Sequence, residues 1–150
     1  MADIELLLTD LSNELCCQPA FNDEGSTTIT FPSGTVVVVE LNYEDDEQLV
    51  MHAVLGDLGV GAYRERVLET AMRANGEAFP RYGDLAFDRA EEKLMLFDMI
   101  PMDNLRGDDL KRHLERFSSK ANEWTEAPSS GNVPQIGGFS NTGPSGMFGL

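Results

Sequence analysis

The spacing of apolar residues changes along the chain, and each change predicts a different element. Residues 3–15 repeat apolar positions with the period of a helix. Residues 27–31, 35–41 and 48–55 are rich in β-branched residues or alternate apolar with polar positions, which predicts three strands. The acidic run 42–47 is expected to be the loop between the second and third strands. Because these strands follow one another closely, we expect an antiparallel meander.

A helix with one buried side is expected at residues 63–75. Its apolar side chains recur at spacings of three and four, while arginines and glutamates take the other faces. Gly59 and Gly61 predict a strand-to-helix turn and not a phosphate-binding loop, because Arg64 stands where a third glycine belongs and no P-loop lysine follows. Gly76, directly after the helix, predicts a left-handed helix end.

Two further strands and a last helix complete the pattern. Residues 85–87 alternate, 88–92 form a polar turn, and 93–101 form a strand that is apolar on both faces. Such a strand is expected at the centre of a sheet, under a helix or a partner subunit. One apolar stripe over residues 108–124 predicts a helix. We therefore expect an α+β fold in the order α-β-β-β-α-β-β-α, with helices packed on a twisted antiparallel sheet.

The last part of the chain has a different composition. Of the 24 residues from 127 to 150, 13 are Gly, Pro or Ser, and none is charged. A segment of this kind buries too little apolar surface to offset the entropy of ordering it. We expect one folded domain at residues 1–125 and a disordered tail at 126–150.

The net charge and its distribution along the chain argue against some classes of binding partner. The net charge is −15, and residues 1–63 hold 12 acidic residues and no lysine or arginine. Such a surface repels phosphate, which argues against nucleic acid and anionic membranes, and it attracts basic polypeptides. Acidity that serves solubility alone is the simpler alternative. No apolar run approaches the length of a membrane span, and the adjacent Cys16 and Cys17 indicate a reducing compartment, so we expect a soluble cytoplasmic protein.

Few residues suggest catalysis or metal binding. Cys16 or Cys17 with His52 could act as nucleophile and base, but nothing in the local sequence supports that role. Adjacent cysteines lack the spacing of a zinc site, and the acidic run 44–47 lacks the alternation of a calcium loop. His113 lies on the apolar stripe of the last helix and is expected to be a core histidine. The sequence therefore predicts a binding protein with no catalytic residues, cofactor or metal.

The order of elements, the size and the acidity resemble the class I type III secretion chaperones, the Tir chaperone family. The most specific match runs over residues 68–124. Arg73-Ala-Asn75 resembles the "RAN" that ends the family's second helix. The following strand pair and the closing helix with its late Trp124 also match. The opening "LLxxL" of the family is matched by Leu7, Leu8 and Leu11, whereas the tail and the Cys16-Cys17 pair depart from the family pattern.

The resemblance implies a homodimeric, ATP-independent chaperone in the cytoplasm of a Gram-negative bacterium, with a role in virulence. Family members bind the N-terminal segment of a secreted effector, hold it extended and deliver it to the secretion apparatus, whose components, such as the ATPase, would be further partners. The effector-binding residues implied by the resemblance are Leu6, Leu7, Leu11, Phe21, Ile29, Phe31, Val37 and Val39. The implied dimer interface comprises Tyr63, Val67, Leu68, Ala71, Met72, Leu85 and Phe87.

Two alternatives stay open. An acidic adaptor of the same fold would bind a folded protein partner and ignore an unfolded segment. A small thiol enzyme would use Cys17 and His52, and a Cys17→Ser variant would separate it from a chaperone, whose client binding should not change.

Overall fold

The structure is a computed structural model of the whole chain, and it describes residues 11, 20–21, 26–42, 45–78, 81–129 and 133–134. The predicted helix at residues 3–15 lies outside this range except for Leu11, which is helical and buried. The elements are β1 (Ala20–Phe21), β2 (Thr27–Thr30), β3 (Val36–Asn42), β4 (Asp45–Asp57), α2 (Ala62–Asn75), β5 (Asp84–Asp88), β6 (Lys93–Pro101) and α3 (Gly107–Ser129).

The strands form one antiparallel sheet in the order β1-β2-β3-β4-β6-β5. The meander and the α+β class are therefore confirmed, and β6 lies between β4 and β5, as its two apolar faces predicted. The short strand β1 was not predicted, and the expected acidic loop at 42–47 is wrong in part. Asp45 already belongs to β4 and pairs with Asn42 of β3, because backbone hydrogen bonds extend a strand whatever its side chains carry.

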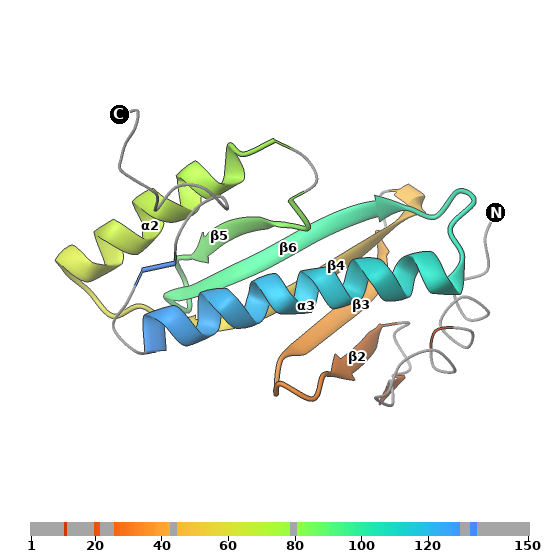
Figure 1. Cartoon of the computed structure of the whole chain (residues 1–150), viewed down its shortest axis with the longest axis horizontal. Helices are drawn as coiled ribbons and strands as arrows, with labels where there is room; N and C mark the ends of the chain where they lie inside the picture. Colours follow the sequence, from red (N-terminus) through yellow and green to blue (C-terminus); the bar gives the residue numbers. More distant parts are fainter. Residues whose placement is uncertain are drawn as a thin grey trace, which may run out of the picture.

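One face of the sheet is packed against α3, which runs across it in Figure 1. The side chains that meet there are large and apolar, as expected for a core that excludes water. The central strands supply Leu49, Met51, Leu94 and Leu96, and all four are fully buried. The helix supplies Leu110, Leu114 and Phe117, none of which is exposed. We call this side of the sheet the packed face.

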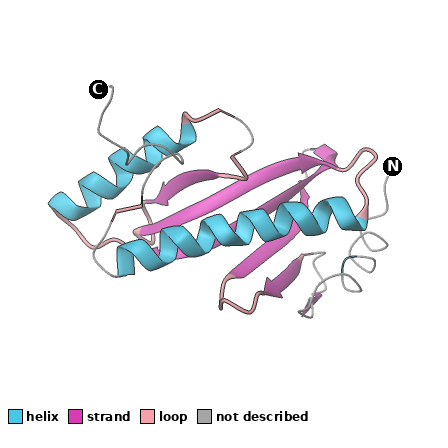
Figure 2. Cartoon of the chain, in the orientation of Figure 1, coloured by secondary structure: helices cyan, strands magenta, loops and turns pink. Residues whose placement is uncertain are grey.

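The helix α2 lies beside β5 at the edge of the sheet (Figures 1 and 2). Val67, Ala71 and Ala74 point inward, at the spacings that the sequence predicted. Gly61 precedes the helix with φ 104°, a conformation that glycine adopts without strain, so the predicted turn is confirmed. The predicted left-handed end is wrong: Gly76 has φ −91°, and its N–H donates to the carbonyl of Arg73 at 3.0 Å.

The helix α3 continues to Ser129, beyond the expected domain boundary at residue 125. After it, Val133 packs against the core and Pro134 is buried. The segment that we expected to be a tail therefore begins with residues that belong to the folded domain. Within the described part of the chain, no helix combines the length and the apolarity needed to cross a bilayer.

Candidate binding surfaces

The side of the sheet opposite the packed face exposes large apolar side chains. Residues that alternate with the core positions of β3, β4 and β6 point to this side, because successive side chains of a strand face opposite ways. Val54 is 56% exposed, Met99 51%, Val36 45% and Phe97 39%. Such a patch marks an interaction site more often than a free surface. We call the open sheet face the surface formed by Val36, Val38, Val50, Val54, Met95, Phe97 and Met99.

Strand pairing makes the open sheet face continuous. The register places Val50 opposite Met99 and Val54 opposite Met95, so β4 and β6 present adjacent apolar pairs. His52, opposite Phe97, interrupts this row, and its Nε2 lies 3.8 Å from a carboxylate oxygen of Glu40. The face is therefore mainly apolar with a few polar groups. It suits a partner that also combines apolar and polar side chains.

A second apolar surface lies between α2 and β5. A hollow of about 280 Å³ opens there, and Met72 stands at it with 75% of its surface exposed. Arg64 holds the start of α2 against the sheet: its guanidinium lies 4.9 Å from the ring centre of Phe87 and 2.7 Å from the Glu92 carboxylate. We call this feature the α2–β5 hollow; it is lined by Leu68, Ala71, Met72, Leu85, Ala86, Phe87 and Leu94.

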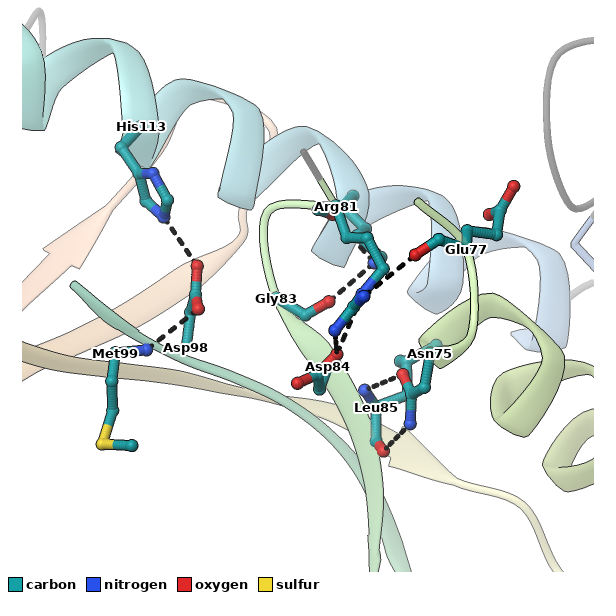
Figure 3. A network of polar contacts seen from close by, with 10 residues as sticks. Asn75, Glu77, Arg81, Gly83, Asp84, Leu85, Asp98, Met99 and His113 are labelled. Atoms are coloured by element: carbon teal, nitrogen blue, oxygen red, sulfur yellow. Dashed lines mark hydrogen bonds and ion pairs between the residues drawn. The ribbon is translucent and has the colours of Figure 1, made fainter. Parts of the chain in front are cut away.

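A hollow beside α3 is lined by ionisable groups, several of which appear in Figure 3. There His113 and Asp98 share a hydrogen bond of 2.7 Å between Nε2 and Oδ2, and Tyr82 lies edge-on to the imidazole at 5.4 Å. We expected a core histidine: the hydrogen bond that ties α3 to β6 satisfies the His113 side chain, but this side chain is only partly buried. Among the residues that the structure describes, no serine, threonine or cysteine lines this hollow beside the His–Asp pair.

The loop before β5 is fastened to α3 by charged groups (Figure 3). Lys120 donates from Nζ to the carbonyls of Arg81 at 2.9 Å and Gly83 at 2.8 Å. Arg81 in turn pairs with Asp84 at 2.9 Å and donates to the carbonyl of Glu77. Burial lowers the pKa of Lys120 below its ordinary value of 10.5. These contacts fix the start of β5, on which the α2–β5 hollow depends.

In the part of the chain that the structure describes, no group of three His, Cys, Asp or Glu side chains could hold a metal ion. Cys17, the nucleophile of the thiol alternative, lies outside the described residues. Its proposed base, His52, stands on the open sheet face beside Glu40.

The residues implied for effector binding are buried in the single chain wherever the structure describes their side chains. Leu6 and Leu7 lie outside the described residues, as does the side chain of Phe21. The remaining five are buried: Leu11, Ile29, Phe31, Val37 and Val39. In the run of four valines at 36–39, alternation alone does not say which pair faces the core. The packed face takes Val37 and Val39, so Val36 is left exposed. The apolar outer row of β6, visible in the sequence, was the available signal for this surface.

The residues implied for the dimer interface do gather in one place. Leu68, Ala71, Met72, Leu85 and Phe87 all line the α2–β5 hollow. Three members of the implied set, Val67, Ala71 and Leu85, are buried within the single chain, whereas Met72 is exposed. Tyr63 stands apart from the hollow, with its ring 5.5 Å from the Arg66 guanidinium. Their role at an interface stays a prediction.

Several solved structures contain a chain with a fold similar to that of this protein. The HopA1–SchA chaperone–effector complex contains a similar chain, with 21% identity, 85% of this chain and 100% of that chain covered, and a TM-score of 0.64. The Yersinia pestis type III secretion chaperone SycH, in complex with a fragment of YscM2, is 20% identical over 79% of this chain and 97% of that one, with a TM-score of 0.59. The ExoT–SpcS complex from Pseudomonas aeruginosa is 19% identical over 82% and 98%, also with a TM-score of 0.59.

At these identities the structural likeness shows the fold alone. No curated protein matches the sequence. The model of the Tir chaperone protein (CesT) family matches residues 6–125, which is most of the chain. The protein therefore belongs to the Tir chaperone protein (CesT) family of type III secretion chaperones.

Proposed function

We propose that this protein is a cytoplasmic chaperone that binds the N-terminal segment of a secreted effector, keeps it extended and soluble without ATP, and delivers it to the secretion apparatus. The observation that carries the proposal is the family match over residues 6–125 in a chain that exposes large apolar side chains. A solved structure of the same fold, the HopA1–SchA complex, is a complex of a chaperone with an effector, which supports a client of that kind.

The surfaces of the protein suit a client that lacks a fold of its own. An extended segment can place apolar side chains on an exposed patch and add its backbone to a sheet edge. The net charge of −15 would speed the encounter with a basic segment. An enzyme would need convergent reactive groups, and no serine, threonine or cysteine is among the described residues that line the hollow at His113 or the α2–β5 hollow.

We further propose that the protein is a homodimer whose interface includes the α2–β5 hollow. Met72 is the strongest support, because a methionine that is 75% exposed beside an apolar hollow gains from burial against a second copy. Leu68 and Phe87 would contact the partner directly. Val67, Ala71 and Leu85 would not contact the partner, since the single chain already buries them. They would instead support the side chains that form the interface.

The dimer is tested by light scattering after size exclusion, which should give about twice the chain mass of 16.5 kDa. A Met72→Asp variant should keep the fold, because the side chain is exposed, yet scatter as a single chain. Val60→Asp is the matched control, since Val60 is 81% exposed and does not line the hollow. A wild-type monomer, or a Met72→Asp dimer of unchanged affinity, would refute this interface.

The chaperone function is tested by purifying the protein from its native cytosol and identifying bound proteins by mass spectrometry. A protein exported by type III secretion should be enriched, and its N-terminal segment alone should bind in calorimetry. Deleting the chaperone should lower the export of that client, and binding of the secretion ATPase to the loaded complex should exceed binding to the client alone. A partner that binds only as a folded domain would favour the adaptor alternative instead.

The first predicted helix provides a direct test of client contact. A helical period over residues 3–15 predicts that Leu6 lies off the apolar stripe, so Leu6→Glu should leave folding intact. If Leu6 and Leu7 contact the client, the variant should bind it at least about tenfold more weakly, because burying a leucine contributes about 1.5–3 kcal/mol. Unchanged affinity would remove these two residues from the proposed site and leave the other surfaces in place.

A further inference from the structure

The open sheet face has an acidic surround. The strand register brings six ionisable side chains to this side of the sheet: Glu40 on β3, His52 and Asp57 on β4, Asp84 and Asp88 on β5, and Lys93 on β6. Four of the six are acids. The ammonium of Lys93 is already occupied by Asp57, which lies 3.4 Å from it. The free charge around this apolar surface is therefore negative.

Neighbouring basic groups compensate this negative charge only in part. Arg81, in the loop before β5, pairs with Asp84 at 2.9 Å. His52 lies 3.8 Å from Glu40, but a histidine adds positive charge only when it is protonated. Asp88 accepts hydrogen bonds from the backbone N–H groups of Ala90 and Glu91 in the β5–β6 turn. A partner with lysines or arginines would meet complementary charge here.

We propose that the open sheet face is a client-binding surface for an extended segment that combines large apolar side chains with lysines or arginines. The proposal rests on the proposed chaperone function and assigns it a surface different from the buried residues Ile29, Phe31, Val37 and Val39. An extended segment alternates its side chains, so one side can cover Val54, Phe97 and Met99. Basic residues at its margins then reach Glu40 and the acidic edge of β5.

A second copy of this chain fits the same face less well. In a symmetric pair the same patch meets itself, so the Glu40 and Asp84 side chains of both copies would gather around one interface. Like charges at an interface oppose association. The apolar stretch is also long enough for an extended client, since β4 has 13 residues and β6 has 9. Charge and shape together favour a basic, unfolded client.

The test uses the full chain and three synthetic peptides as long as β4: alternating Val-Lys, alternating Val-Glu and alternating Ser-Lys. Fluorescence anisotropy measures binding of each. We expect the Val-Lys peptide to bind at least about tenfold more tightly than the other two, because only it supplies both apolar contact and positive charge. Equal binding of the Val-Lys and Val-Glu peptides would overturn the charge argument, and equal binding of Val-Lys and Ser-Lys would overturn the apolar one.

Variants locate the binding. The double variant Val54→Thr/Phe97→Thr removes apolar surface while keeping the charge and the β-propensity of both positions. It should weaken Val-Lys binding at least about tenfold. The matched control Val60→Thr changes an exposed valine in the β4–α2 loop and should bind as the wild type does. Glu40→Gln should weaken binding and lower its dependence on salt. Unchanged binding by the double variant would overturn the proposal.

Two other occupants would give distinct results. If the double variant dissociates a dimer that Met72→Asp leaves intact, a second copy covers the face and the proposal is wrong. If removing residues 135–150 is needed before any peptide binds, the chain's own C-terminus covers the face, which also overturns it. An identified effector segment that binds the wild type and the double variant equally would refute this surface while the chaperone function stands. If the protein binds the Val-Lys peptide but carries no exported client, the surface stands and the chaperone function is refuted.

Discussion

Asn75 and Leu85 are joined by a pair of hydrogen bonds that resembles one rung of a β-sheet. The backbone N–H of Leu85 donates to Oδ1 of Asn75 at 2.7 Å, and Nδ2 of Asn75 donates to the carbonyl of Leu85 at 2.8 Å (Figure 3). Because β5 is the edge strand, this side chain occupies backbone groups that would otherwise be open to another strand. Strand addition at this point of the edge would have to displace α2.

Replacing Asn75 should therefore destabilise the protein. In Asn75→Ala the N–H and carbonyl of Leu85 lose both partners while they stay partly buried, which should lower the free energy of unfolding by about 1–3 kcal/mol. Urea unfolding measures the change. Arg73→Ala is the control on the same helix, because its ion pair with Glu69 is solvent-exposed and contributes about 0–1 kcal/mol. Equal effects of the two substitutions would contradict this role of Asn75.

Gly83 allows the loop before β5 to approach the core. Its φ is 122°, and a Cβ added there would lie 3.0 Å from Cδ1 of Leu96 and 3.1 Å from Cε2 of Phe117. Gly83→Ala should lower the free energy of unfolding by about 1–3 kcal/mol from steric overlap, with the strain of the backbone in addition. Thermal unfolding at matched concentrations measures this effect.

Gly34 is the matched control for that substitution. It also has a positive φ, 93°, but a Cβ added there would meet nothing within 4 Å. Gly34→Ala should therefore show the cost of backbone strain alone and be milder than Gly83→Ala. If Gly34→Ala proves as destabilising as Gly83→Ala, close packing against Phe117 is not what selects glycine at position 83.

Lys120 should make stability depend on pH in the alkaline range. Its pKa is lowered by burial in the folded chain, so between that lowered pKa and the ordinary 10.5 the unfolded chain binds more protons than the folded one. Stability then rises with pH within this window, and the contribution is constant below it. Comparing wild type with Lys120→Met by urea unfolding from neutral pH to about 10.5 should show this rise only in the wild type.

Lys111→Met on the same helix α3 controls for the loss of one positive charge. It should keep the alkaline rise, since the hydrogen bonds from Lys120 to Arg81 and Gly83 remain. A wild-type protein that shows no rise relative to Lys120→Met would mean that the Lys120 ammonium is as well solvated in the fold as in the unfolded chain.

The C-terminal segment should divide into two parts. Removing residues 135–150 should change stability by no more than about 0.5 kcal/mol if that part makes no core contact. Removing 127–150 also deletes the end of α3 and the contact of Val133 with the core, and should lower the free energy of unfolding by about 1–3 kcal/mol. This replaces the expectation of a tail that begins at residue 126. If the two truncated chains are equally stable, the original expectation of a tail that begins at residue 126 is correct.

The sequence determined where most elements lie, because periodicity is a local property. The stripe of α2 and the two apolar faces of β6 follow from side-chain spacing alone, and both were confirmed. The change from a period near 3.6 to a period of 2 after Gly83 likewise marked the hairpin of β5 and β6. The resemblance to the Tir chaperone family rested on the order of these local patterns, and the family match bears it out.

Only the tertiary structure decided which surfaces are open to a partner. Residues 36–39 are four identical valines that alternate in direction, so their sequence is equally consistent with either pair in the core. The packing of α3 on one face of the sheet buries Val37 and Val39 and leaves Val36 in solvent. The role of Asn75 was equally hidden, because its partner Leu85 is ten residues away. Contacts of this kind depend on how elements meet in space, which no local spacing encodes.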